Sequence, residues 1–143
     1  MIAVQKAVTV PRAPHDAFRL FVDDIARWWP LATHSVGREA ATSVVFENGV
    51  GGRIVETYAG GRTAVWGTVT EWDPPTRVRF SWHPGTREEE ATEVEVRFSA
   101  VAGGTEVELV HTGWDRRPDG PEARAGYEGG WEYVLGFFAA AAG

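Results

Sequence analysis

Apolar and polar residues alternate along the middle of the chain with the two-residue period of β-strands. Six stretches follow this pattern or are rich in β-branched residues, and turns rich in Gly or Pro separate them. They cover residues 42–47, 53–58, 63–72, 76–83, 91–100 and 105–112. Because the connections between these stretches are short, we expect an antiparallel meander.

The last three stretches predict which face of the sheet is buried. Val78, Phe80 and Trp82 share one face, and the next two stretches place aliphatic and aromatic residues at the matching positions. The opposite face carries Arg77 and Arg79, followed by further Arg and Glu residues. We expect the charged face to be a solvated surface on which opposite charges pair across strands, rather than a binding patch.

Helical segments flank the six stretches. After a first strand over residues 2–10, Pro14 and Asp16 suit the start of a helix. Pro30 disfavours the α conformation at the preceding residue, so this helix, or pair of helices, ends there. Near the C-terminus, residues 119–142 repeat aromatic and aliphatic side chains at three- and four-residue steps. This predicts a long helix that can lie across the apolar face, although each Gly in it costs about 1 kcal/mol relative to Ala.

Composition narrows the class of protein. The 143 residues suit a single domain over residues 1–143. The chain has no Cys, which excludes disulfides and Cys-ligated metals. A net charge of −6 argues against nucleic acid or an anionic membrane as partner. No apolar run could span a bilayer and no signal-peptide pattern is present, so we expect a cytoplasmic location.

The familiar motifs of catalysis are missing from the sequence. The four His residues include no pair at i and i+4, and the single Lys does not lie in a phosphate-binding loop. No Gly-x-Ser-x-Gly element occurs. We therefore expect no metal, no cofactor and no catalytic residue that a motif would identify.

Six local motifs nevertheless resemble one known family. They are residues 17–21 (AFRLF), 26–30 (ARWWP), 51–53 (GGR), 67–82 (GTVTEWDPPTRVRFSW), 104–114 (GTEVELVHTGW) and 130–135 (GWEYVL). In this order and spacing the chain resembles the activator of heat-shock-protein ATPase homologue-like family of the START-like (SRPBCC) superfamily. The resemblance extends over nearly the whole chain.

The resemblance implies an α+β helix-grip fold. In such proteins an antiparallel sheet of about seven strands wraps around a long C-terminal helix, with short helices after the first strand. A cavity between sheet and helix takes apolar or amphipathic small molecules. The founding activator also uses an N-terminal chaperone-binding domain, which 143 residues cannot contain in addition.

The residues expected to face this cavity are mostly aromatic, as is usual for small-molecule pockets. The parity that His111 shares with Leu109 fits either an inward polar group or a hydrogen-bonded structural histidine. The parity that Glu56 shares with Ile54 and Tyr58 would place its carboxylate inside, where it would need a partner. The candidate ligand-binding residues are Trp28, Trp29, Glu56, Trp66, Phe80, Trp82, Phe98, His111, Tyr127, Trp131, Leu135 and Phe138.

Three functions stay open at this point. The first is a noncatalytic module that binds a small apolar or aromatic ligand. The second is an enzyme of the aromatase or cyclase kind, in which His111 or Glu56 moves protons. The third is a chaperone-associated or other interaction domain that uses a sheet edge or an exposed loop over residues 114–117. The sequence determines neither the ligand nor an oligomeric state.

Overall fold

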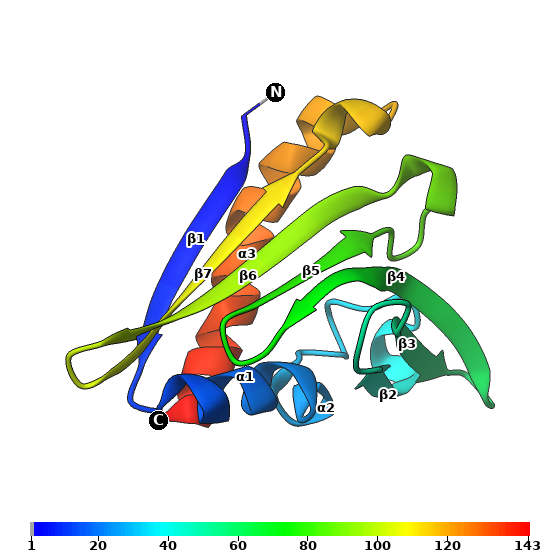
Figure 1. Ribbon diagram of the computed structural model, residues 1–143. Coiled ribbons are helices and arrows are strands. Elements are labelled where there is room, and N and C mark those ends of the chain that lie inside the picture. The colour runs from blue at the N-terminus through cyan, green and yellow to red at the C-terminus, as the bar shows by residue number, and fades with distance from the viewer. Residues whose placement is uncertain (1) are drawn as a thin grey trace.

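Seven antiparallel strands form one curled sheet in the order β1-β7-β6-β5-β4-β3-β2 (Figure 1). The computed structural model describes residues 2–143. The strands are β1 (Val4–Val10), β2 (Ala41–Phe46), β3 (Arg53–Tyr58), β4 (Arg62–Asp73), β5 (Arg77–Trp82), β6 (Thr92–Val101) and β7 (Gly104–Thr112). The expected meander is confirmed, and the N-terminal strand adds to it by pairing with β7.

Three helices accompany the sheet. Helices α1 (Pro14–Val22) and α2 (Ile25–Trp28) follow β1, which resolves the predicted N-terminal helix into a pair. The second ends where Trp29 becomes extended in front of Pro30. Helix α3 (Gly120–Ala142) is the predicted C-terminal helix and runs diagonally behind β1, β7 and β6 (Figure 1). Three short 3₁₀ turns lie in the connections, at Arg38–Ala40, Glu88–Glu90 and Trp114–Arg116.

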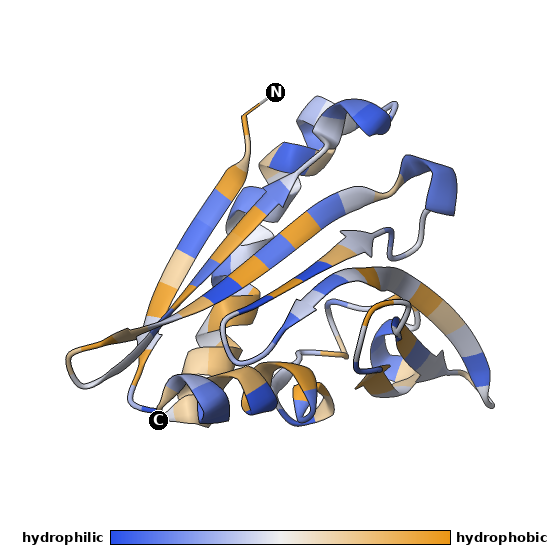
Figure 2. Cartoon of the chain, viewed as in Figure 1, coloured by the Kyte–Doolittle hydropathy of each residue, from blue (hydrophilic) through white to orange (hydrophobic). Residues whose placement is uncertain are grey.

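The predicted buried face is confirmed by the strand register. Val78 lies opposite Val96, which in turn lies opposite Leu109, and all three side chains are fully buried. Apolar and hydrophilic positions alternate along these strands, as Figure 2 shows by colour. The concave face of the sheet and α3 thus share one core.

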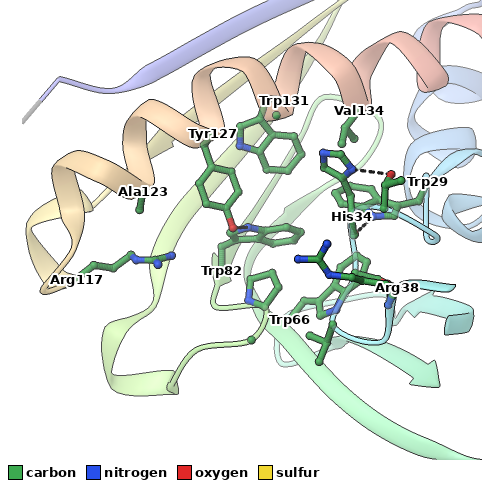
Figure 3. A pocket seen from close by; sticks show the side chains of 17 residues that line it. Trp29, His34, Arg38, Trp66, Trp82, Arg117, Ala123, Tyr127, Trp131 and Val134 are labelled. Atoms are coloured by element: carbon green, nitrogen blue, oxygen red, sulfur yellow. Dashed lines mark hydrogen bonds between the residues drawn. The ribbon is translucent and has the colours of Figure 1, made fainter. Parts of the chain in front are cut away.

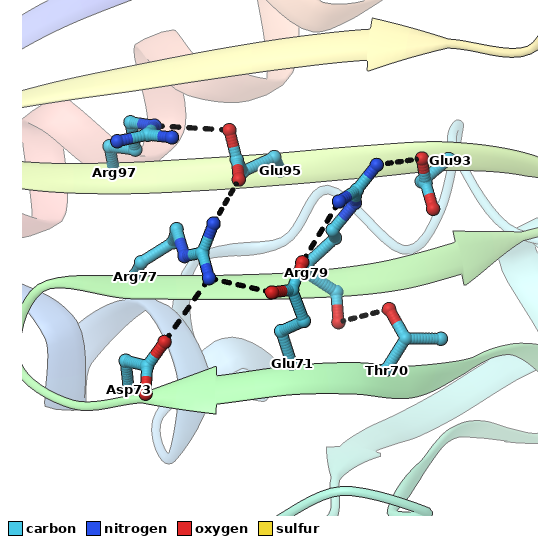
Figure 4. A network of polar contacts seen from close by, with 8 residues as sticks. All are labelled: Thr70, Glu71, Asp73, Arg77, Arg79, Glu93, Glu95 and Arg97. Atoms are coloured by element: carbon cyan, nitrogen blue, oxygen red, sulfur yellow. Dashed lines mark hydrogen bonds and ion pairs between the residues drawn. The ribbon is translucent and has the colours of Figure 1, made fainter.

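The charged positions form an ion-pair network on the outer face of β4, β5 and β6 (Figure 4). Arg77 donates to Glu71 at 2.7 Å and to Glu95 at 3.0 Å. Arg79 donates to the other oxygen of Glu71 at 2.9 Å and also to Glu93. Hydrogen bonding from Arg79, followed by the charges of both arginines, lowers the pKa of Glu71. The predicted cross-strand pairing is therefore present.

A bulge in β4 bends the sheet along this strand. In the pairing of β4 with β3, the register shifts between Ile54 and Val55 of β3. In its pairing with β5, the register shifts between Val69 and Glu71 of β4. Gly67 lies in the bent part, where a Cβ atom would stand 1.7 Å from the carbonyl oxygen of Ser81. A side chain there cannot fit, so Gly allows the close approach of β4 to β5. Among residues 2–143, no helix combines the length and apolarity needed to cross a membrane.

Candidate functional site

A pocket of about 570 Å³ opens between the sheet, helix α3 and the loop before β2 (Figure 3). Its sheet side is aromatic, its helix side combines small residues with Tyr127 and Trp131, and its rim carries polar and cationic groups. It is lined by Trp29, Thr33, His34, Ser35, Val36, Arg38, Trp66, Trp82, Pro84, Gly85, Arg117, Ala123, Gly126, Tyr127, Gly130, Trp131 and Val134.

Four tryptophans form a continuous aromatic wall. The ring of Trp29 lies 5.0 Å from that of Trp66 and 5.8 Å from that of Trp131, measured between centroids. Trp82 contacts Trp66 at 5.6 Å and Trp131 at 5.4 Å. Tyr127 adds a polar atom, because its hydroxyl accepts a hydrogen bond from Trp82 Nε1 at 3.0 Å. The wall is held by edge and tilted contacts, which aromatic pairs favour.

Small residues on helix α3 leave the space that forms the pocket. Ala123, Gly126 and Gly130 recur at steps of three and four and therefore share the helix face that lines the pocket. A Cβ atom built on either Gly would meet nothing within 4 Å. From helix propensity alone, each of these glycines is only a cost to the helix. Their helical spacing beside aromatic residues is the signal that identifies them as pocket residues.

Glu56 lies behind the wall and is fully buried. Its carboxylate accepts hydrogen bonds from the backbone N–H of Val36 and of Gly37, each at 2.8 Å. It also accepts one from Trp66 Nε1 at 2.8 Å. The carboxylate points inward, and its oxygens are occupied by these donors. Glu56 thus joins a wall tryptophan to the loop over the pocket.

That loop comprises residues 33–38. Ser35 Oγ donates to the carbonyl of Leu31 at 2.6 Å and accepts from the N–H of Arg38 at 2.8 Å. Gly37 is required here, because a Cβ atom would stand 2.4 Å from Cβ of Tyr58. The loop is therefore tied down by hydrogen bonds and packing, and it places His34 and Arg38 on the pocket rim.

His111 is also fully buried, one layer behind the pocket. Trp131 Nε1 donates to His111 Nδ1 at 2.9 Å, and His111 Nε2 lies 2.6 Å from Thr92 Oγ1. An indole N–H can only donate, so Nδ1 is the acceptor and Nε2 carries the proton. Burial, and secondarily the charge of Arg117, lowers the pKa of His111 to about 3. At neutral pH it is an uncharged imidazole with both nitrogens engaged.

The structure brings five of the twelve predicted residues to the pocket surface, namely Trp29, Trp66, Trp82, Tyr127 and Trp131. Glu56 and His111 lie just behind this surface and hold it in place. The other five are buried in the hydrophobic core and do not line the pocket. They are Trp28, Phe80, Phe98, Leu135 and Phe138.

In the loop over residues 114–117, Asp115 and Arg116 are exposed, but the expected exposure of Trp114 is wrong. Trp114 is 1% exposed and packs against His111 in a tilted arrangement, with ring centroids 4.0 Å apart. Arg117 lines the pocket and binds both carboxylate oxygens of Asp119, at 2.8 and 2.9 Å. The Gly113 turn, with a φ of 84°, folds this segment back onto the core. It therefore offers no exposed tryptophan to a partner.

Among the described residues, no three His, Asp or Glu side chains converge as they would to hold a metal ion. The polar groups that reach the pocket are the phenol of Tyr127 and the rim residues. Figure 3 shows the tryptophans around the pocket together with His34 and Arg38. Such a site suits recognition of an aromatic or apolar molecule with a few polar contacts.

A curled antiparallel sheet that holds a long C-terminal helix, with a pocket between them, defines the helix-grip class of the START-like superfamily. The chain belongs to the family of Activator of Hsp90 ATPase homolog 1-like proteins, whose model matches residues 12–143. The resemblance that the sequence motifs indicated is thereby confirmed.

Solved structures agree with this assignment. An anthrahydroquino-gamma-pyrone synthase, Txn09, is 30% identical to this chain, with a TM-score of 0.62 over 100% of this chain and 88% of that one. A protein from Rhodobacter sphaeroides, 23% identical, superposes with a TM-score of 0.71 over 98% and 91% of the two chains. The protein MLL2253 from Mesorhizobium loti, 16% identical, gives 0.69 over 96% and 94%. None of the curated proteins matches this chain.

Proposed function

We propose that this protein is a binding module for a small aromatic or apolar molecule held in the tryptophan-walled pocket. The observation that carries the proposal is the open space itself. Aromatic side chains that could have closed on α3 instead face Gly126 and Gly130 across a volume of about 570 Å³. Small-molecule sites are typically apolar clefts of roughly 300–1,000 Å³.

The walls support an aromatic ligand in particular. Four indoles and a phenol offer flat surfaces at different angles, on which a planar ring system can stack or pack edge-on. The wall is also preorganised. Trp66 is held by Glu56 and Trp131 by His111, so binding requires little ordering of these side chains.

The test uses anthracene-2-carboxamide, an uncharged planar probe, with energy transfer from tryptophan as the signal. A Gly130→Leu variant puts a side chain into the space that a Cβ atom enters without contact, and should abolish binding. Gly129→Leu is the matched control, because Gly129 is exposed on the same helix and outside the lining. We expect saturable binding by the wild type and the control alone.

Two results would contradict a binding pocket at this place. One is the absence of saturable binding of this probe and of its carboxylate analogue to the wild type. The other is equal binding by the two leucine variants. Thermal unfolding should show that both variants are folded, since both substitutions raise helix propensity.

A second candidate function is an enzyme of the cyclase kind, and the 30% identical synthase structure favours it. The geometry does not support His111 or Glu56 as the acid or base, because their polar atoms are already engaged. Groups that face the pocket, such as Tyr127, are better placed to exchange a proton with a ligand. If Tyr127→Phe left turnover of an identified substrate unchanged, this role of Tyr127 would be excluded.

A further inference from the structure

We infer that the ligand of this pocket is an aromatic anion, and that the Arg38 guanidinium on the rim binds its acidic group while its rings lie against the tryptophans. The inference rests on the proposed function and adds the chemical class of the ligand. Its basis is the combination of a preorganised loop, an unpaired cation and an aromatic pocket at one place.

The loop holds Arg38 in an unusual backbone conformation. Its φ is 49°, in the left-handed region that residues other than Gly avoid at a cost of about 1–2 kcal/mol. The backbone N–H of Arg38 donates a hydrogen bond to Ser35 Oγ, which supports this geometry. The Glu56 carboxylate accepts hydrogen bonds from the backbone N–H groups of the two preceding residues, Val36 and Gly37. Backbone strain that neighbours maintain in this way is concentrated at functional sites.

Arg38 is also the cation of the pocket that is free to bind an anion. Within the described residues no carboxylate oxygen comes within 4.0 Å of its guanidinium, whereas Arg117 pairs with Asp119 through Nε and Nη2. Figure 3 shows the Arg38 side chain extending from the loop toward the tryptophans. A guanidinium binds a carboxylate or a similar planar anion through two parallel hydrogen bonds.

The third titratable group on the rim does not compete for this role. Partial burial, followed by the charge of Arg38, lowers the pKa of His34. His34 is therefore neutral at pH 7 and stacks on Tyr133, with ring centroids 4.8 Å apart. A cationic ligand would suit the aromatic wall by cation–π attraction, but it would meet the unpaired charge of Arg38 at the entrance.

The experiment compares two probes of nearly equal shape, anthracene-2-carboxylate and anthracene-2-carboxamide. The wild type should bind the carboxylate about tenfold more tightly, which corresponds to one charge-assisted hydrogen-bonded pair. Arg38→Gln should remove this preference and leave the affinity for the carboxamide unchanged. Arg19→Gln is the matched control, because it removes the same charge from an exposed position on α1 outside the lining.

Several outcomes would overturn the role of Arg38. One is that the wild type binds the two probes with equal affinity. A second is that Arg38→Gln weakens the binding of both probes equally. A third is that Arg117→Gln or Arg19→Gln removes the preference for the carboxylate while Arg38→Gln keeps it. If the wild type binds both probes equally and Gly130→Leu abolishes the binding of both, the proposed binding pocket is supported and only the anion inference fails. If neither probe binds the wild type, the proposed function fails first.

Discussion

Trp131 on helix α3 donates its indole N–H to Nδ1 of His111 on strand β7, over 2.9 Å. The bond links the helix to strand β7 of the sheet behind the pocket, and it determines which nitrogen of the imidazole carries the proton. Thr92 extends this series of hydrogen bonds, since its hydroxyl lies 2.6 Å from His111 Nε2 and donates to the carbonyl of Trp82 at 3.2 Å. A histidine in this arrangement stabilises the pocket as a neutral group.

The stability of the protein should therefore fall in mild acid through His111. Its pKa is about 3 in the folded chain, whereas an unfolded His titrates at about 6.5. Between these values the unfolded state binds more protons. The stabilisation is thus complete above about pH 6.5 and decreases by up to ~1.4 kcal/mol per pH unit as the pH falls toward 3.

Urea unfolding of wild type and His111→Gln at several pH values between 7 and 4 measures this effect. Gln keeps an acceptor for Trp131 and a donor for Thr92 but does not titrate. The free-energy difference between the two proteins should shrink as the pH falls. His15→Gln, at an exposed histidine on α1, should follow the wild type. A constant difference between wild type and His111→Gln across the range would contradict the role of His111.

Replacing Glu56 by Gln should loosen the loop over the pocket. The Gln amide keeps one acceptor oxygen but turns an NH₂ group toward N–H donors that Glu56 now satisfies. We expect a loss of about 2 kcal/mol in the free energy of unfolding, as for a buried donor left without a partner. Binding of the anthracene probes should weaken as well. Glu47→Gln, at a half-exposed carboxylate that accepts only from Arg53, should change stability far less.

Glycine substitutions should separate the open pocket from the packed core. Gly130→Ala should stabilise the chain by about 0.5–1 kcal/mol, because the methyl group enters open space and favours the helix. Gly67→Ala should destabilise it by about 1–3 kcal/mol, because the methyl group meets the carbonyl of Ser81. Denaturant unfolding of the two variants and the wild type measures both changes in stability. Destabilisation by Gly130→Ala would mean that the pocket is closed in solution.

The outer-face network should contribute little at high salt. Arg79→Gln removes hydrogen bonds to Glu71 and Glu93 and should lower the Tm by roughly 2–4 °C in dilute buffer. Salt screens such exposed pairs, so most of the difference should disappear in 1 M NaCl. Arg62→Gln, at an exposed arginine, serves as the control and should show no comparable salt dependence. A Tm difference that is unchanged by salt would indicate a packing role for Arg79 instead.

Much of the fold was predictable from local patterns. Strand β3 was expected over the residues that form it, and the other strands and helix α3 differ from their expected bounds by at most two residues. Alternation of period two and the three- and four-residue steps of α3 depend on backbone geometry, so nearby residues suffice to identify them. The buried side of β5, β6 and β7 followed from the same parity.

The site was predictable only in part. Parity indicated that Trp66 and Trp82 face inward, but it applied equally to Phe80 and Phe98, which pack in the core. Whether an inward side chain fills space or borders a void depends on the volumes of residues that other elements bring opposite to it. That information is spread over the whole chain.

Periodicity and turn residues alone thus specified an antiparallel sheet with an apolar face and a helix to cover it. Only the tertiary structure decided that α3 presents Gly126 and Gly130 to that face, which leaves the pocket open. It alone decided that Glu56 anchors the loop of Arg38 across 20 residues of sequence. A buried carboxylate must find donors wherever the folded chain supplies them, and no local pattern records that choice.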